Sequence, residues 1–433
     1  MIQHFDDNKF HLGSLVRRSR MGWPLATVAG LALAGTLHAQ VASPHGIPTN
    51  PYISATEQAG IDEDILDQHF GDIPNDPGPK AKLSPALDPA SVDAAVRKVA
   101  DWELKRADPY MNTHWTWAVL GTGFMAASRQ LNDPRYSNAM LGMAEKYHWQ
   151  MAAEDLEGRG WPDNNDQAIA QTYMELYFLD PKPEKIEPTR KGLDSLIGTP
   201  QPPPPSGQFQ QPWWWCDSLF MGPPLWARMS VATHDPKYLK YADDRWWEVS
   251  DKMYSTTYHL YYRDKIYIGV LDPAGKPIFW SRGNGWVMGG LARTLEYMPK
   301  DFPNRPRYVK QYRELAAALA ALQDPKNGLW HADLLDPADF PQPEISGSSL
   351  ILFGMAWGVN NGILDRATFM PVIAKGWRGM VNEIYADGRL GNVQQTDEAP
   401  QHYLPQSSFN FGVGGFLLAG EEVAKLQKSH PTH

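Results

Sequence analysis

The chain has 433 residues, of which 42% are hydrophobic and 12% aromatic, and its formal net charge is −9. This length and apolar content allow a large buried core. The acidic balance argues against nucleic-acid binding through a basic surface, so we expect no nucleic-acid partner. The single cysteine, Cys216, excludes an internal disulfide and a zinc site built on cysteines.

The first 39 residues have the features of an export signal. A basic segment containing Arg17 and Arg18 precedes a short apolar stretch and Ala39, a plausible cleavage residue. The apolar stretch is too short for a comfortable membrane span. We therefore expect residues 1–39 to be a signal peptide, the mature protein to be periplasmic or secreted, and no stable membrane insertion after the signal is removed. The alternative is an uncleaved tail.

Residues 40–90 are rich in Pro, Asp and Gly and show weak periodicity, which indicates an N-terminal arm or linker. From Ser91 the pattern changes, and residues 91–102 form a capped amphipathic helix in the prediction.

From there to the C-terminus a pattern recurs at intervals of roughly 50 to 60 residues. Each copy has an apolar helix rich in small residues, a loop that often contains Asp-Pro, and an amphipathic helix. The copies begin near Trp115, Asp166, Asp217, Gly285 and Ser346, and a last apolar helix spans 411–426. Small residues let inner helices pack closely around an axis while amphipathic helices cover them. We predict an all-α (α/α)6 barrel over residues 91–433, with short loop strands such as 265–271; a solenoid of stacked helix pairs shares the pattern.

The most informative segment is 213–224, where three tryptophans and Cys216 precede Asp217 and an apolar stretch containing prolines. Aromatic walls exclude water, and a carboxyl group that loses water has a raised pKa, which suits a general acid. Indole faces also stack on sugar rings. We interpret Asp217 as the proton donor of a carbohydrate-active enzyme. The alternative is a helix N-cap, with the tryptophans as core filling.

Three further helix starts carry polar and aromatic residues, at 114–117, 161–166 and 279–286. In a closed ring these starts and Asp217 open toward one pocket, which would combine carboxylates, a guanidinium and indoles. Each has a structural alternative. Asp166 can cap its helix, Trp115 and Trp117 can be core residues, and Arg282 can form a structural stack between Trp280 and Trp286.

Other chemistries lack support in the sequence. There is no Gly-rich phosphate loop and no Gly-x-Ser-x-Gly nucleophile elbow. The histidines are scattered and form no pair at the spacing of metal ligands on a helix. We therefore expect neither a metal nor a cofactor.

Three segments resemble glycoside hydrolase family 105, the unsaturated rhamnogalacturonyl and related glucuronyl hydrolases, with family 88 as close kin. They are Trp-x-x-Asp-Ser-Leu-Phe-Met-x-x-Pro at 214–224, Trp-x-Arg-Gly-Asn-Gly-Trp at 280–286, and Asn-Asp-Gln-Ala-Ile-Ala-Gln-Thr-Tyr at 165–173. The resemblance covers roughly residues 92–425 and implies the (α/α)6 barrel that the repeats also favour. It implies an acidic oligosaccharide substrate, made by a polysaccharide lyase, whose non-reducing end is a uronic acid with a C4=C5 double bond.

The resemblance implies that this double bond is hydrated. Asp217 would protonate the enol-ether carbon and then activate the water that adds at C5, after which the hemiketal opens and the glycosidic bond is lost. Asp166 would position water or bind substrate hydroxyls. The other substrate-binding residues that it implies are Trp115 or Trp117, Trp215, Trp280, Arg282, Asn284 and Trp286.

One residue departs from the family pattern. Many members carry a pocket histidine after a Leu-Tyr-Tyr-like stretch, and here 260–262 is followed by Arg263. Arg263 either supplies a cation for an acidic or sulfated substrate or pairs with Asp264. The source polysaccharide stays open among rhamnogalacturonan, ulvan and glycosaminoglycan. The alternative functions are a sugar lyase or epimerase on the same barrel and a non-catalytic glycan-binding barrel.

Overall fold

The structure is a computed structural model that describes residues 71–108, 110–152, 162–198, 213–396 and 400–428. The predicted signal peptide at 1–39 and residues 40–70 of the predicted arm lie outside the described residues. No helix within the described ranges has both the length and the apolar character needed to cross a membrane.

A closed ring of inner helices forms the centre of the molecule. Its members are α4 (Trp115–Leu131), α7 (Ala170–Leu179), α10 (Pro223–Thr233), α12 (Ser281–Leu295), α14 (Ile345–Asn360) and α16 (Asn410–Lys428). Each contacts the next, and α16 returns to α4. This closure confirms the predicted (α/α)6 barrel and excludes the solenoid, whose terminal units do not meet.

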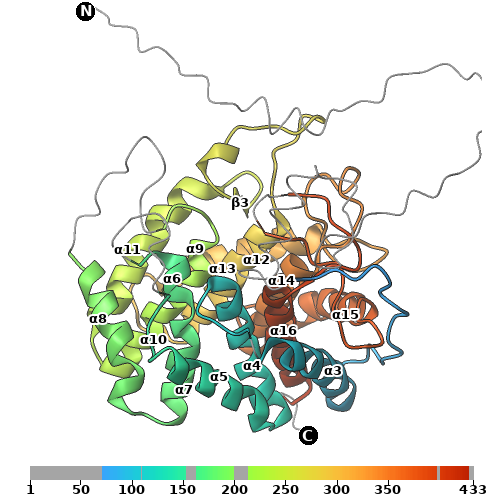
Figure 1. The fold of residues 1–433 in the computed structure, drawn as a ribbon. Helices are drawn as coiled ribbons and strands as arrows, with labels where there is room; N and C mark the ends of the chain where they lie inside the picture. Colours follow the sequence, from blue (N-terminus) through green and yellow to red (C-terminus); the bar gives the residue numbers. More distant parts are fainter. Residues whose placement is uncertain (1–70, 109, 153–161, 199–212, 397–399, 429–433) are drawn as a thin grey trace, which may run out of the picture.

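An outer layer of helices covers this ring. Its members are α3 (Pro89–Ala107), α5 (Pro134–Lys146), α8 (Glu187–Leu196), α11 (Pro236–Met253), α13 (Arg305–Ala321) and α15 (Arg366–Asn382). Figure 1 shows α8 and α11 on one side and α3 and α15 on the other, with α12, α14 and α16 between them. The Asp-Pro pairs begin two outer helices: Asp133 and Asp235 are N-caps that accept N–H bonds two residues on, and the prolines occupy the first turn.

Glycines bring the inner helices close together, as the composition of the apolar helices predicts. A Cβ placed on Gly123 of α4 would lie 2.6 Å from the Cα of Gly414 in α16. A Cβ on Gly285 of α12 would lie 2.9 Å from the carbonyl oxygen of Gly347 in α14. Any larger residue would therefore push these backbones apart, and the ring would widen.

Short elements connect the helices. They are α6 (Asn164–Ala168), α9 (Ser218–Met221), the 3-10 turns η1 (Pro183–Lys185) and η3 (Lys265–Tyr267), and the strands β1 (Gly71–Asp72), β2 (Tyr254–Ser255), β3 (Leu260–Tyr261) and β4 (Ser408–Phe409). Antiparallel pairs join β1 to β4 and β2 to β3. The prediction of a strand over 265–271 is wrong. Asp264 accepts the N–H of Ile266 at 2.7 Å, which favours a helical turn at that point.

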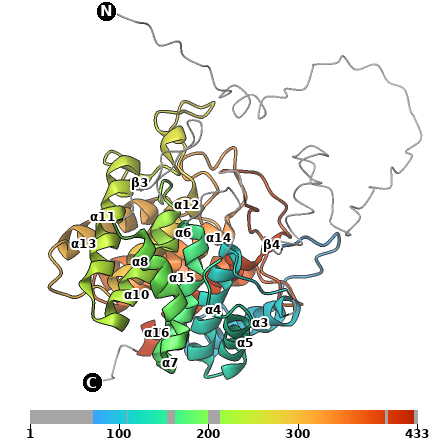
Figure 2. The ribbon, with the colours of Figure 1, turned by 60° about the vertical axis from the view of Figure 1, so that its left-hand side comes forward.

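The two ends of the ring differ. In Figures 1 and 2 the loop after β3 and those leading into α14 gather at one end, and the C-terminus lies at the other. The inner helices α4, α12 and α14 begin at the looped end. The polar and aromatic residues at their starts therefore come together there.

Candidate active site

A cavity of about 210 Å³ lies where the inner helices begin. Its lining residues are Trp115, Asn165, Trp215, Asp217, Met221, Arg263, Trp280, Arg282, Trp286 and Thr396. They come from α4, α6, α9 and α12 and from the segments before α9, after β3 and before β4. The cavity is smaller than those that hold drug-sized ligands and suits a single sugar ring.

Asp217 stands at the start of α9 but does not cap it. Its backbone is already helical, with φ −60° and ψ −31°, and its side chain makes no capping hydrogen bond. The alternative interpretation of Asp217 as a capping residue is therefore wrong, because capping needs an extended backbone that turns the side chain toward the helix N–H groups. The carboxyl group instead accepts a hydrogen bond from the thiol of Cys216, with Sγ 3.4 Å from Oδ1.

Burial raises the pKa of the Asp217 carboxyl group to about 6. The positive charges of Arg263 and Arg282 and the thiol hydrogen bond lower the pKa, but loss of water outweighs them. A pKa in this range lets one carboxyl group first donate a proton and then, as the carboxylate, accept one near neutral pH.

Two guanidinium groups reach the cavity, and they differ in what else they bind. Arg282 is 1% exposed, and its terminal nitrogens donate to the carbonyl oxygens of Gln394 and Gln395, each at 2.8 Å. It also stacks on Trp280, with 4.3 Å from Cζ to the ring centroid. Much of its hydrogen-bonding capacity therefore holds the loop that contains Thr396 against the cavity.

Arg263 follows β3, and part of its side chain remains exposed to solvent. Its Nη1 pairs with Oδ2 of Asp264 at 2.8 Å, and 25% of its side chain is exposed whereas that of Asp264 is buried. The carbonyl of Arg263 accepts the N–H of Cys216 at 2.8 Å, which ties its loop to the residue before Asp217. The pairing with Asp264 and the place at the cavity, expected as alternatives, occur together.

Indole rings form the apolar part of the wall. Trp115 meets Trp286 edge to face, with ring centroids 6.2 Å apart, and both line the cavity. Trp215 and Trp280 line it from their own segments. Trp117 is 3% exposed and belongs to the hydrophobic core, so the structure distinguishes between the two tryptophans that the sequence left open.

Asp166 lies beside this cavity without lining it. Its Oδ2 accepts the N–H of Asp163 at 2.9 Å, and Asp163 accepts the N–H of Asp166 in return at 3.1 Å, which is a capping box. Asp166 lines a different, wider cavity of about 1200 Å³ along α5 and α8. Its neighbour Asn165 lines the cavity of Asp217.

Comparison with known proteins now gives the family. The model of Glycosyl Hydrolase Family 88 matches residues 91–427. The chain belongs to this family. A relative from Formosa agariphila, named unsaturated 3S-rhamnoglycuronyl hydrolase, is 34% identical over 361 residues, which are 79% of this chain and 93% of the relative.

Solved structures of similar fold cover most of this chain. A family 88 glycosyl hydrolase from Bacteroides vulgatus has a TM-score of 0.72 and 29% identity, over 78% of this chain and 99% of that one. A protein named as a polysaccharide lyase has a TM-score of 0.73 and 33% identity, over 80% of this chain and 99% of that one. Family 88 membership confirms the prediction of a glycoside hydrolase, and the named relatives support the unsaturated uronyl class.

In this family 88 chain, Asn284 has a structural role beside the site. Its amide group donates to the carbonyl of Tyr261 at 3.1 Å and accepts the N–H of the same residue at 2.8 Å, so it holds β3 against α12. It does not line the cavity, and a contact with substrate stays a prediction. Three lining residues were not foreseen: Asn165, Met221 and Thr396. Asn165 and Met221 stand inside recognised motifs, whereas Thr396 has no local signal.

Proposed function

We propose that the chain removes a 4,5-unsaturated uronic acid from the non-reducing end of an oligosaccharide by hydrating its double bond. The observation that carries the proposal is the half-buried carboxyl group of Asp217, which has a pKa of about 6 and is the one carboxyl group among the described residues that line a cavity sized for one sugar ring. A site for one terminal ring suits an enzyme that acts from the chain end. The printed names of the relatives support the unsaturated uronyl substrate.

In the proposed reaction Asp217 is first the acid. Its proton goes to the enol-ether carbon C4, and positive charge develops at C5 and the ring oxygen. The Asp217 carboxylate then takes a proton from the water that adds to C5. The resulting hemiketal opens to a ketone at C5, and the aglycone leaves as the bond at C1 is lost. One carboxyl group therefore serves both proton transfers, and no second carboxyl group is needed at a fixed separation.

Arg263 is proposed to bind the acidic part of the substrate. It has an exposed edge at the cavity, whereas the terminal nitrogens of Arg282 already hold two carbonyl groups. A guanidinium fork matches a carboxylate or a sulfate group. Because two relatives are named for a 3S-rhamnoglycuronyl substrate, we propose that the aglycone begins with a sulfated rhamnose.

The decisive measurement is the ultraviolet absorbance of the conjugated double bond. Incubation with unsaturated disaccharides should bleach it, and Asp217→Asn should reduce the bleaching rate at least about a thousandfold while the circular dichroism spectrum is unchanged. Full activity in Asp217→Asn would contradict the mechanism.

The aglycone is tested separately. Across a panel of lyase digests, faster bleaching of sulfated than of desulfated rhamnose-containing fragments would support the proposed sulfated rhamnose. An Arg263→Gln variant should raise KM more than it lowers kcat.

A lyase is the second candidate, because one similar structure is named as a polysaccharide lyase. Lyases of this barrel normally need a His or Tyr base, and among the described residues that line the Asp217 cavity neither type occurs. The same absorbance separates the two reactions. A lyase acting on an intact polysaccharide creates the absorbing double bond, whereas the proposed hydration removes it.

We also propose that the chain is exported. Support comes from the basic and apolar segments within residues 1–39. Expression in a Gram-negative host with cell fractionation tests this, since export predicts a periplasmic or secreted product that begins near residue 40. Full-length protein in the cytosolic fraction would count against it.

A further inference from the structure

The turn that carries Asp217 is interrupted in a way that leaves backbone carbonyl groups without helical donors. α9 ends at Met221, and α10 begins with Pro223 and Pro224. Proline has no N–H, so it cannot bond to the carbonyls of Leu219 and Phe220, four residues earlier. The N–H of Leu225 goes to Gly222 instead of Met221. Buried carbonyl groups of this kind need other partners.

Gln171 of α7 is the partner of two of these carbonyl groups. Its Nε2 donates to the carbonyl oxygens of Phe220 at 2.9 Å and Met221 at 3.1 Å. The side chain is 1% exposed. Met221 lines the cavity, and its N–H and that of Phe220 bond back to the carbonyl of Asp217, at 3.3 and 3.0 Å. Gln171 therefore binds the C-terminal end of the turn that begins at Asp217.

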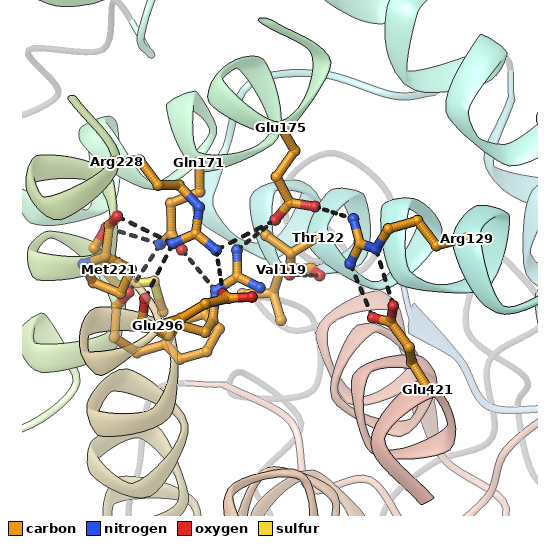
Figure 3. Close-up of polar contacts among 12 residues, drawn as sticks. Val119, Thr122, Arg129, Gln171, Glu175, Met221, Arg228, Glu296 and Glu421 are labelled. Atoms are coloured by element: carbon orange, nitrogen blue, oxygen red, sulfur yellow. Dashed lines mark hydrogen bonds and ion pairs between the residues drawn. The ribbon is translucent and has the colours of Figure 1, made fainter. Parts of the chain in front are cut away.

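The other end of the Gln171 amide is fixed by charge. Oε1 accepts a hydrogen bond from Nε of Arg293 at 2.9 Å, and Nη2 of Arg293 pairs with Glu175 at 2.8 Å. Figure 3 shows this chain of contacts running from Met221 through Gln171 to Glu175. A guanidinium only donates and a carbonyl only accepts, so the residue between them must accept at one end and donate at the other. A neutral amide meets both demands.

We propose that Gln171 is a positioning residue, which with Arg293 holds the Asp217 turn in register with the substrate ring. The inference rests on the proposed role of Asp217 as the acid. Nothing in the reaction touches Gln171 directly, so its effect passes through the placement of the acid. Misplacement of a reacting group by about 1 Å costs on the order of a hundredfold in rate.

The test compares Gln171→Met and Gln171→Glu with Glu421→Gln. The Met variant has a similar size but cannot donate a hydrogen bond to the two carbonyl groups. The Glu variant still accepts a hydrogen bond from Arg293, but it presents a carboxylate oxygen to the carbonyls of Phe220 and Met221. Glu421 belongs to the same network, since it pairs with Arg129 at 2.9 Å, yet it lies away from the Asp217 turn (Figure 3). We expect both Gln171 variants to lose about tenfold to a hundredfold in kcat, with a smaller change in KM and a displaced pH limb. Glu421→Gln should lower Tm while keeping kcat within about twofold of the parent.

Parental kcat and pH profile in a folded Gln171 variant would overturn the inference. An equal loss of kcat in Glu421→Gln would also overturn it, because the network would then act through general stability. If the Met variant does not fold, the Glu variant, which retains the bond to Arg293, decides the outcome. If Asp217→Asn is inactive and the Gln171 variants are unaffected, only this inference fails. If Asp217→Asn is active, the proposed function fails.

Discussion

The acidity of Asp217 results from a competition at the residue scale. Burial raises its pKa, and Arg263, the thiol of Cys216 and Arg282 oppose this. A helix N-terminus also stabilises a carboxylate, but α9 has only four residues and offers little aligned dipole. The aromatic surroundings read from the sequence therefore predict the correct direction of the shift. The thiol contact and the two cations limit its size.

The pH dependence of kcat/KM follows with a definite sign. The free enzyme must hold Asp217 protonated to act as the acid, so kcat/KM should be level below pH 6 and fall about tenfold per unit above it. In Arg263→Gln a group that lowers this pKa is lost, so the falling limb should move to higher pH, and Arg263→Lys should move it less. Initial rates of bleaching across pH measure both effects. A profile that is highest in alkaline solution would contradict the assignment.

At the scale of elements, local sequence determines where helices begin and which faces they bury. The Asp-Pro pairs at 133–134 and 235–236 start two outer helices because Asp caps and Pro fits the first turn. Small residues mark the inner helices because close approach of two backbones tolerates no side chain. The prediction of a strand over 265–271 was wrong at this scale, because the turn capped by Asp264 outweighed the apolar alternation, and only Leu271 among the described residues of this segment forms a β-bridge, with Pro277.

Substitution of an inner-ring glycine tests that close approach. A Cβ on Gly414 would lie 2.3 Å from the carbonyl oxygen of Val119, so Gly414→Ala should lower the free energy of unfolding by about 1–3 kcal/mol. Gly142 in the outer helix α5 has no atom within 4 Å of an added Cβ, and Gly142→Ala should raise it by about 0.5–1 kcal/mol. Urea unfolding of both variants makes the comparison. Equal effects would mean that the α4 and α16 contact is not tight.

At the scale of the whole molecule, ion pairs link helices of the inner ring, and their members are buried except for Arg129, whose side chain is 42% exposed. Glu175 of α7 pairs with Arg293 of α12 at 2.8 Å and with Arg129 of α4 at 2.6 Å, and Arg129 continues to Glu421 of α16. Figure 3 shows Glu175, Arg129 and Glu421 reaching toward one another from their separate helices. A carboxylate shared by two guanidiniums is costly to leave half paired. The network therefore ties together helices that are far apart in sequence.

Glu175→Gln should lower the free energy of unfolding by about 3–5 kcal/mol at neutral pH. Burial acts to raise the pKa of Glu175, but Arg129, Arg293 and Arg228 outweigh it and hold the pKa at about 2. A lowered folded-state pKa contributes stability above the unfolded-state pKa, and that stability is lost as pH falls toward 2. The difference between parent and variant should therefore shrink in acid. A difference that stays constant from neutral pH to pH 2 would contradict the pairing.

The sequence by itself determined the barrel, and it predicted Asp217 as the candidate acid and most of the aromatic wall of its cavity, because repeat spacing and residue type are local properties. Only the tertiary structure decided which neighbours face the cavity. Asn165 and Asp166 are adjacent, but successive helical residues point in different directions, and the capping box with Asp163 directs the Asp166 carboxylate elsewhere. Thr396 arrives from a loop that Arg282 holds in place, and the Gln171 contact spans 49 residues. Such contacts depend on how the ring closes, and no local pattern encodes that.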